Sequence, residues 1–255
     1  MKILTLLVPL VFALSAVRGE PLLHETFANG SFTADWTQKP KEYEIIADDT
    51  AKNGYALRLH QSRRTLAMLP NDGRPVSTWT EDQIQKWKNY QYTIRYRLEK
   101  RPEPPAEGSR NHAIFALLWR CHPTEESSRE ALLITAMIDQ NAKGYSGVFW
   151  FHQPRVNWFG KQEIFAETDI MNQQFIRGIG KGVPMDTAWH ELEVSVVGDR
   201  STILFDGEKI YSGQDKRAPA GGIGVTPYLD DTGKGSGVRA ILIDEIKVEP
   251  LPNNE

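Results

Sequence analysis

The chain has 255 residues, of which 40% are hydrophobic and 25% are charged, which is the balance of a folded globular protein rather than a disordered or fibrous one. Its formal charge is −3 and it contains no run of basic residues, so charge gives no indication of a nucleic-acid partner. Cys121 is the single cysteine, which excludes an internal disulfide. We expect a small buried side chain at Cys121 and a fold that depends on a large apolar core.

The N-terminus has the pattern of a secretory signal peptide. Lys2 is followed by an apolar run over residues 3–16, and small residues including Gly19 precede the expected cleavage point. The run is shorter than the ~20 residues that a membrane-spanning helix needs. We therefore expect residues 1–19 to be removed, leaving a secreted or periplasmic protein without a membrane span, in which residues 20–255 form a single domain.

Alternation of apolar and polar residues predicts β-strands along most of the chain. In YQYTIRYRL (90–98) the aromatic and aliphatic residues occupy one face and the polar residues the other. Further strands are expected at 112–122, 131–139, 147–153, 192–196, 202–205, 208–213 and 238–250. Asp206-Gly207 is typical of a two-residue hairpin turn, and TEDQIQKWKNY (80–90) predicts one short helix. The expected fold is an all-β antiparallel sandwich.

Four segments resemble parts of a known superfamily. They are LLHETFANGSFTADW (22–36), WHELEVSVVGDRSTILFDGEKIYSG (189–213), APAGGIGV (218–225) and ILIDEIKV (241–248). Together they are similar to the concanavalin A-like lectin/glucanase jelly rolls, and in particular to laminin-G-like domains and domains related to 3-keto-disaccharide hydrolases. The resemblance implies a jelly roll that fills the mature chain, with Trp36 and Trp189 in its core, and it implies carbohydrate as the partner.

The catalytic pattern of laminarinase-type glucanases is incomplete in this chain. The segment AETDIMNQ supplies Glu167 and Asp169, but Met171 stands where the second Glu of that pattern belongs. A retaining mechanism needs two carboxyl groups about 5–5.5 Å apart, so the sequence disfavours this activity. Residue types used by jelly-roll polysaccharide lyases occur in MIDQ (137–140) and GYSGVFWFHQ (144–153), although not in the order of the lyase motifs.

The central strands carry the candidate sugar site, if they form the concave sheet. Arginine and histidine can hydrogen-bond hydroxyl groups, tryptophan can stack on a sugar ring, and a histidine near a carboxylate can perform acid–base chemistry. The candidates for acid–base work are His152 or His122 with Asp139, and those for substrate binding on the strands are Arg95, Arg97, Arg120 and Trp150. The alternative is that the arginines are solvated cross-strand charges and that His122 begins a loop.

Two loops add further candidates. In QPRVNWFGKQE (153–163), Trp158 and Phe159 are either a sugar-stacking platform or a lid on the core. LDDTGKGSG (229–237) is either a solvated turn or a structural calcium site using Asp230 or Asp231. No other cofactor is expected, since the histidines lack the spacing of a zinc site.

These features leave three hypotheses for function. The chain is a secreted carbohydrate-binding or carbohydrate-processing protein with a sugar site on the concave sheet, a glycoside hydrolase or polysaccharide lyase with a His/Asp acid–base pair, or a structural adhesion module. The enzyme would use the His/Asp pair with Arg95, Arg97, Arg120 and Trp150, whereas a binding module would use Trp150, Trp158 and Phe159 as stacking surfaces. The sequence does not separate an enzyme from a binding module.

The signal peptide generates a direct prediction. When the full chain is expressed with its own leader in a secreting host, we expect the exported protein to begin at Glu20, which N-terminal sequencing of the mature product would establish. A mature protein that still begins at Met1 would contradict the expectation.

Overall fold

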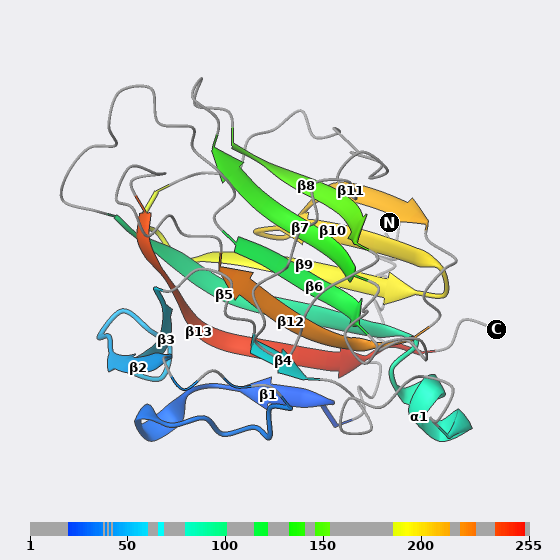
Figure 1. Cartoon of the computed structure of the whole chain (residues 1–255), viewed down its shortest axis with the longest axis horizontal. Helices are drawn as coiled ribbons and strands as arrows, with labels where there is room; N and C mark the ends of the chain where they lie inside the picture. Colours follow the sequence, from blue (N-terminus) through cyan, green and yellow to red (C-terminus); the bar gives the residue numbers. More distant parts are fainter. Residues whose placement is uncertain are drawn as a thin grey trace, which may run out of the picture.

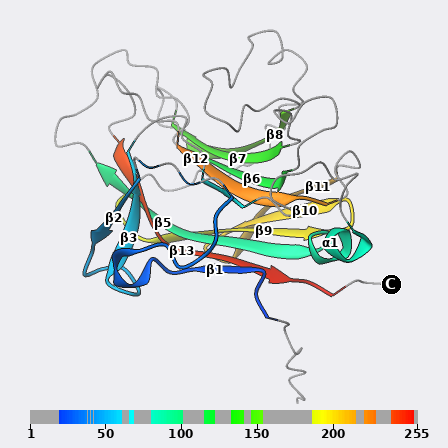
Figure 2. The same ribbon diagram turned by 60° about the horizontal axis from the view of Figure 1, so that its bottom comes forward.

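The computed structural model describes residues 20–37, 39, 41, 43–60, 66–68, 80–100, 115–121, 133–140, 146–153, 186–214, 220–227 and 238–252, and the structural statements below concern these residues. They form an eight-stranded sheet and a five-stranded sheet, both antiparallel in every pairing, which are stacked on one another (Figure 1 and Figure 2). The expected all-β antiparallel sandwich with one short helix is confirmed.

The larger sheet, called sheet A, contains strands from both ends and the middle of the chain. Its spatial order is β11 (Glu208–Gln214), β10 (Arg200–Phe205), β9 (His190–Val197), β5 (Tyr90–Lys100), β13 (Val238–Pro250), β3 (Tyr55–Leu59) and β2 (Glu44–Ala47). The short strand β1 (Leu23–Glu25) also pairs with β13, with Leu23 opposite Val248. The 3-10 turn η1 (Ala28–Gly30) follows β1.

The smaller sheet, called sheet B, has the order β4 (Leu66–Met68), β12 (Gly222–Pro227), β6 (Phe115–Cys121), β7 (Leu133–Gln140) and β8 (Ser146–Gln153). The expected long hairpin over residues 131–153 is present as the β7–β8 pair. The Gly-Ile-Gly segment forms β12 and lies between β4 and β6. In Figure 2 the strands of sheet B curve so that their outer side, away from sheet A, is concave.

Strand β5 lies at the centre of sheet A. It pairs along its length with β13, from Tyr90 opposite Pro250 to Lys100 opposite Val238, and with β9 on its other side. Its burial alternates strictly from Tyr90 to Leu98, as the period-two pattern predicts. The buried side chains point toward sheet B, because the Tyr92 hydroxyl donates to the Gly224 carbonyl of β12 at 3.1 Å.

The C-terminal hairpins also follow the sequence pattern. β9 pairs with β10 and β10 pairs with β11, and the turn between β10 and β11 is Asp206-Gly207. Both turn residues have positive φ angles, 48° and 78°, which the Asp-Gly sequence accommodates at low cost. The β10–β11 ladder shifts register between Ile203 and Leu204.

Helix α1 (Glu81–Lys86) is shorter than the 80–90 segment expected to hold it. Thr80 and Gln83 form a reciprocal capping box at its start. The helix ends at Trp87, which is buried and packs edge-on against Tyr90 at 5.9 Å between ring centroids. The chain must be extended from Tyr90 onward to enter β5, so the helix stops early. Among the described residues, no helix is long and apolar enough to cross a membrane.

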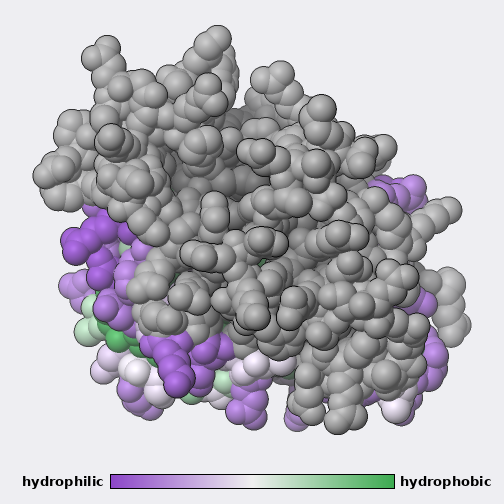
Figure 3. Space-filling view, viewed as in Figure 1, coloured by the Kyte–Doolittle hydropathy of each residue, from purple (hydrophilic) through white to green (hydrophobic). Residues whose placement is uncertain are grey.

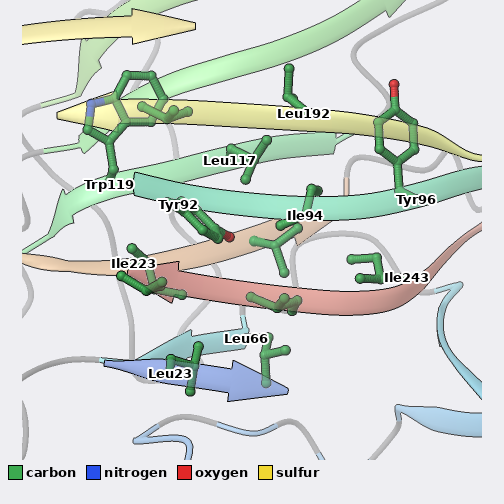
Figure 4. Packing of buried hydrophobic residues seen from close by; sticks show 14 of the residues in the cluster. Leu23, Leu66, Tyr92, Ile94, Tyr96, Leu117, Trp119, Leu192, Ile223 and Ile243 are labelled. Atoms are coloured by element: carbon green, nitrogen blue, oxygen red, sulfur yellow. The ribbon is translucent and has the colours of Figure 1, made fainter. Parts of the chain in front are cut away.

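The main core lies between the two sheets (Figure 4). Tyr92, Ile94 and Tyr96 of β5 project into it from sheet A, and Leu117 and Trp119 of β6 project into it from sheet B. All five side chains are fully buried. By contrast, the described residues visible in Figure 3 lie mostly at the margin of the molecule and are largely hydrophilic.

Buried Glu25 organises the N-terminal segment after β1. Its carboxylate accepts hydrogen bonds from the backbone N–H groups of Phe27, Thr33 and Ala34, at 2.9 to 3.1 Å, and from the Thr33 hydroxyl at 2.7 Å. The Trp36 indole N–H also donates to it at 3.0 Å, and Trp36 joins the main core as expected. Burial raises the pKa of Glu25, but these donors outweigh it and the net pKa is lowered.

We expect Glu25→Gln to lower the free energy of unfolding by about 2–4 kcal/mol, because the new NH₂ group would face N–H donors in a buried site. The exposed Glu208→Gln serves as the matched control and should change stability little. Urea unfolding followed by tryptophan fluorescence measures both.

The Glu25 carboxyl group also makes the free energy of unfolding depend on pH. Because the pKa of folded Glu25 is below its usual value, its contribution is present above the unfolded pKa and is lost as pH falls through the folded pKa. The stability difference between wild type and Glu25→Gln should therefore shrink on acidification below about pH 4.5. A difference that stays constant down to the acid transition would contradict the assignment.

Candidate functional site

The structure divides the expected group of site residues between the two sheets. Arg95 and Arg97 lie on β5 of sheet A, whereas Arg120, Asp139, Trp150 and His152 lie on strands of sheet B. Since Tyr92 and Ile94 point into the core, the alternating Arg95 and Arg97 point to the outer face of sheet A, away from sheet B. The arginines and the sheet B residues therefore do not form one groove.

On the outer face of sheet A, both arginines pack over Trp189, the residue before β9. The guanidinium carbon of Arg95 lies 4.5 Å from the Trp189 ring centroid, and that of Arg97 lies at 5.4 Å. The indole N–H donates to the Thr50 hydroxyl at 3.0 Å. Trp189 also packs on a small apolar cluster of Ala51, Ala56 and Leu242. Its expected position in the main core is therefore wrong, because it lies on the opposite face of sheet A.

Each arginine is paired with a buried carboxylate. Arg97 donates to Asp48 through Nη2 at 2.6 Å and Nε at 3.2 Å, and Arg95 donates to Asp244. Asp244 also accepts the backbone N–H of Lys52 at 2.8 Å. We call Trp189, Arg95, Arg97, Asp48, Thr50 and Asp244 the Trp189 clamp, since together they hold the β2–β3 connection against sheet A.

The pKa values of the two carboxyl groups of the clamp are shifted in opposite directions. Burial raises the pKa of Asp48, but hydrogen bonds from Thr50 and Arg97 outweigh it and the net pKa is lowered. Burial also raises the pKa of Asp244, and there the Lys52 N–H and the Arg95 charge do not fully offset it. The guanidinium groups of Arg95 and Arg97 are therefore already paired with carboxylates of the protein itself.

Arg120 is fully buried and its backbone φ is 53°, in the left-handed region. It sits where the β6–β12 ladder shifts register, between Trp119 opposite Ile223 and Cys121 opposite Gly222. Its backbone N–H donates to the Tyr90 hydroxyl at 2.9 Å, and its guanidinium donates to the Gly198 carbonyl. In this structure Arg120 supports the β9–β10 turn rather than an open surface.

The register of sheet B separates the expected acid–base pair. His152 is opposite Ile134, which is opposite Trp119, whereas Asp139 is opposite Gly147. Residues 134 and 139 differ by an odd number, so His152 and Asp139 occupy alternate rows of the ladder. Trp150 is opposite Ala136, which is opposite Leu117, so Trp150 and Leu117 lie in the same row. Residues directly opposite one another share a face of a sheet, so His152 and Asp139 are not cross-strand neighbours in this ladder.

The roles of several candidates stay predictions. His122, Trp158, Phe159, Asp230 and Asp231 lie outside the described residues, and the side chains of Asp139, Trp150 and His152 do as well. Within the part of the chain that the structure describes, no group of three or more His, Cys, Asp or Glu side chains is arranged to hold a metal ion.

A second cluster of charged groups was not anticipated from the sequence. His190, at the start of β9, contacts Asp206 through Nδ1 at 2.7 Å and Asp186 through Nε2 at 2.9 Å. Its ring packs against Phe205 and Tyr96, with centroids 5.0 and 6.1 Å apart. His190 lies in the segment that resembles the superfamily and Asp206 lies in the expected hairpin turn, but their contact follows only from the pairing of β9 with β10.

Comparison with known proteins supports the fold. No known family and no curated protein matches the sequence. Among solved structures, the carbohydrate esterase from the Shiga toxin-encoding bacteriophage phi24B aligns over 91% of this chain and 99% of its own, with a TM-score of 0.54 and 16% identity. The two proteins share a fold, which in this chain is a sandwich of two antiparallel sheets. The superfamily resemblance of the four sequence segments implies a fold of this kind.

Two further solved structures align with lower TM-scores. The carbohydrate-binding module CBM66 from Bacillus subtilis aligns over 87% of this chain and 98% of its own, with a TM-score of 0.47 and 12% identity. The carbohydrate recognition domain of Emp47p aligns over 84% and 90%, with a TM-score of 0.46 and 10% identity.

Because Arg97 belongs to the Trp189 clamp, we expect its substitution to change stability rather than ligand binding. We expect Arg97→Gln to lower the free energy of unfolding by about 1–3 kcal/mol, because it leaves buried Asp48 with a weaker partner. The matched control is Arg200→Gln, an exposed arginine of the same sheet. Chemical denaturation of both variants tests this, and an unchanged midpoint for Arg97→Gln would count against the clamp.

Proposed function

We propose that this chain is a secreted carbohydrate-binding protein whose sugar site lies on the concave outer face of sheet B. The observation that carries the proposal is that the arginines on the outer face of sheet A already have carboxylate partners. On sheet A, Arg95, Arg97 and Arg58 are each paired with a carboxylate of the same face. Polar groups committed to internal partners are poor ligands for sugar hydroxyls, because each new contact must replace an existing one.

Sheet B offers the chemistry that sugar recognition needs. Strand β8 carries the aromatic run Phe149-Trp150-Phe151, and the neighbouring strand β7 carries Asp139. Aromatic rings stack on the apolar faces of sugars, and a carboxylate accepts hydrogen bonds from adjacent hydroxyl groups. The similar phage structure is described as a carbohydrate esterase, which supports carbohydrate as the ligand class.

The ladder supports one row of sheet B as the row of the proposed site. Leu117 and Trp119 project into the core, so the alternate row faces outward. Asp139 belongs to that alternate row, and so does Phe151, which is opposite Thr135. Trp150 shares the row of Leu117, so within the proposed site we expect Asp139 and Phe151 to contribute more than Trp150.

A glycan array followed by calorimetry on the best ligand tests the proposal. We expect Asp139→Asn and Phe151→Ala to raise Kd by about tenfold or more, as loss of a central contact usually does. Two variants serve as controls: Trp150→Phe, in the other row of the same strand, and Trp189→Phe, in the clamp of sheet A. Both should leave Kd unchanged.

Two outcomes would count against this function. Absence of binding to any plant, algal or bacterial glycan would remove the carbohydrate proposal altogether. Loss of affinity in Trp189→Phe together with wild-type affinity in Asp139→Asn would move the site to sheet A.

A carbohydrate-processing enzyme is the second candidate, favoured by the description of the phage structure. Incubation with glycans that bind should then release reducing ends, unsaturated uronates or acetate, which distinguish a hydrolase, a lyase and an esterase. Product formation that Asp139→Asn abolishes, while binding persists, would establish catalysis. Binding without any product would leave the chain as a binding protein.

A further inference from the structure

The imidazole of His190 is held between two carboxylates, one on each ring nitrogen. Nδ1 is 2.7 Å from Asp206 Oδ2, and Nε2 is 2.9 Å from Asp186 Oδ1. A carboxylate is an acceptor only, so both contacts are hydrogen bonds only when both ring nitrogens carry protons. A neutral imidazole has one N–H, and its bare nitrogen would face a carboxylate oxygen. The two contacts cannot both persist in the neutral ring.

The two carboxylates are held with unequal strength. Asp206 accepts the backbone N–H of Glu191 at 2.8 Å on its second oxygen, and its own N–H donates to the Glu191 carbonyl at 2.9 Å. Asp186 accepts the Ala188 N–H at 2.8 Å on the same oxygen that faces His190. Asp206 is thus anchored in the β9–β10 pairing, whereas Asp186 belongs to no strand and its side chain is more exposed, at 55% against 46%.

We propose that His190 is a proton-dependent latch. When doubly protonated it joins Asp186 to Asp206, and when it loses the Nε2 proton it keeps Asp206 and releases Asp186. The displaced proton goes to solvent, and no covalent bond changes. Asp186 lies four residues before His190, the first residue of β9, so the latch controls how the segment that leads into β9 is attached to sheet A.

The charges around the ring favour the latched state. The titratable and charged groups that act on the cluster are Asp186, Asp206, Tyr96 of β5 and Lys100, whose charge acts on Asp186. Phe205 packs on the ring and does not titrate. Burial lowers the pKa of His190, but the hydrogen bonds that its ring donates to Asp206 and Asp186 outweigh this effect, so the net pKa is raised. Release therefore occurs as pH rises through the raised pKa of His190.

Amide hydrogen exchange resolves the two halves of the latch. Ala188 N–H reports on Asp186, and Glu191 N–H reports on Asp206. We expect Ala188 to lose about tenfold of its protection between about pH 5.5 and pH 8.5, after correction for intrinsic exchange, while Glu191 keeps its protection. NMR of the imidazole nitrogens should show the Nδ1–H tautomer above the transition.

Variants complete the test. His190→Gln, which has no titrating group, should leave Ala188 unprotected at both pH values. Asp199→Asn, at the other end of the same β9–β10 hairpin, is the matched control and should behave as wild type. The proposal is overturned if Ala188 protection does not change with pH in the wild type, if Glu191 opens together with it, or if His190→Gln keeps the pH dependence. The wild-type measurement decides the question even if a variant does not fold.

Discussion

The strict alternation of β5 between two chemical faces is the constraint on which the rest of the structure depends. The strand lies between β9 and β13, so its backbone is paired on both edges. Its even-numbered residues from Tyr90 to Leu98 fill the core, and its odd-numbered residues include Arg95 and Arg97. A shift of one residue would bury two guanidinium groups and expose three tyrosines, which would cost far more than any single contact in the molecule.

The tyrosines of β5 also connect the two sheets through their hydroxyl groups. Tyr92 donates to the Gly224 carbonyl of β12, and Tyr90 accepts the backbone N–H of Arg120 on β6. Glycine at 224 and the ladder shift near Arg120 leave these backbone groups accessible to the rings. Buried polar groups require partners, so these bonds fix how sheet B is placed over sheet A, whereas apolar packing alone would tolerate small displacements. On the opposite face, Arg95 and Arg97 bind Asp244 and Asp48, so β5 organises both the core and the Trp189 clamp.

Strand and turn positions were predictable to a large extent, and the candidate site was not. The hairpin strands around Gly198 and Asp206, the long strand at 238–250 and the capped helix after Thr80 all follow from local patterns. The grouping of Arg95 with Asp139 and His152 did not follow, because alternation gives the face of a residue within its own strand but does not tell which sheet holds the strand. The partners Asp48, Asp186 and Asp244 were missed for the same reason. Asp244 in the apolar run ILIDEIKV was the one available signal, since a carboxylate in a buried strand needs a cationic partner.

The sequence by itself determined the elements of this protein. Its period of two, its Asp-Gly turn and its capping box depend on residues that are neighbours along the chain, and their geometry is set by local sterics and hydrogen bonding. Only the tertiary structure decided which strands share a sheet and which residues of sheet B lie in the same row. It also decided that His190 lies between Asp186 and Asp206. Those contacts depend on pairing between distant segments, such as Lys52 with Asp244, and pairing is selected by the packing of the whole core rather than by any local pattern.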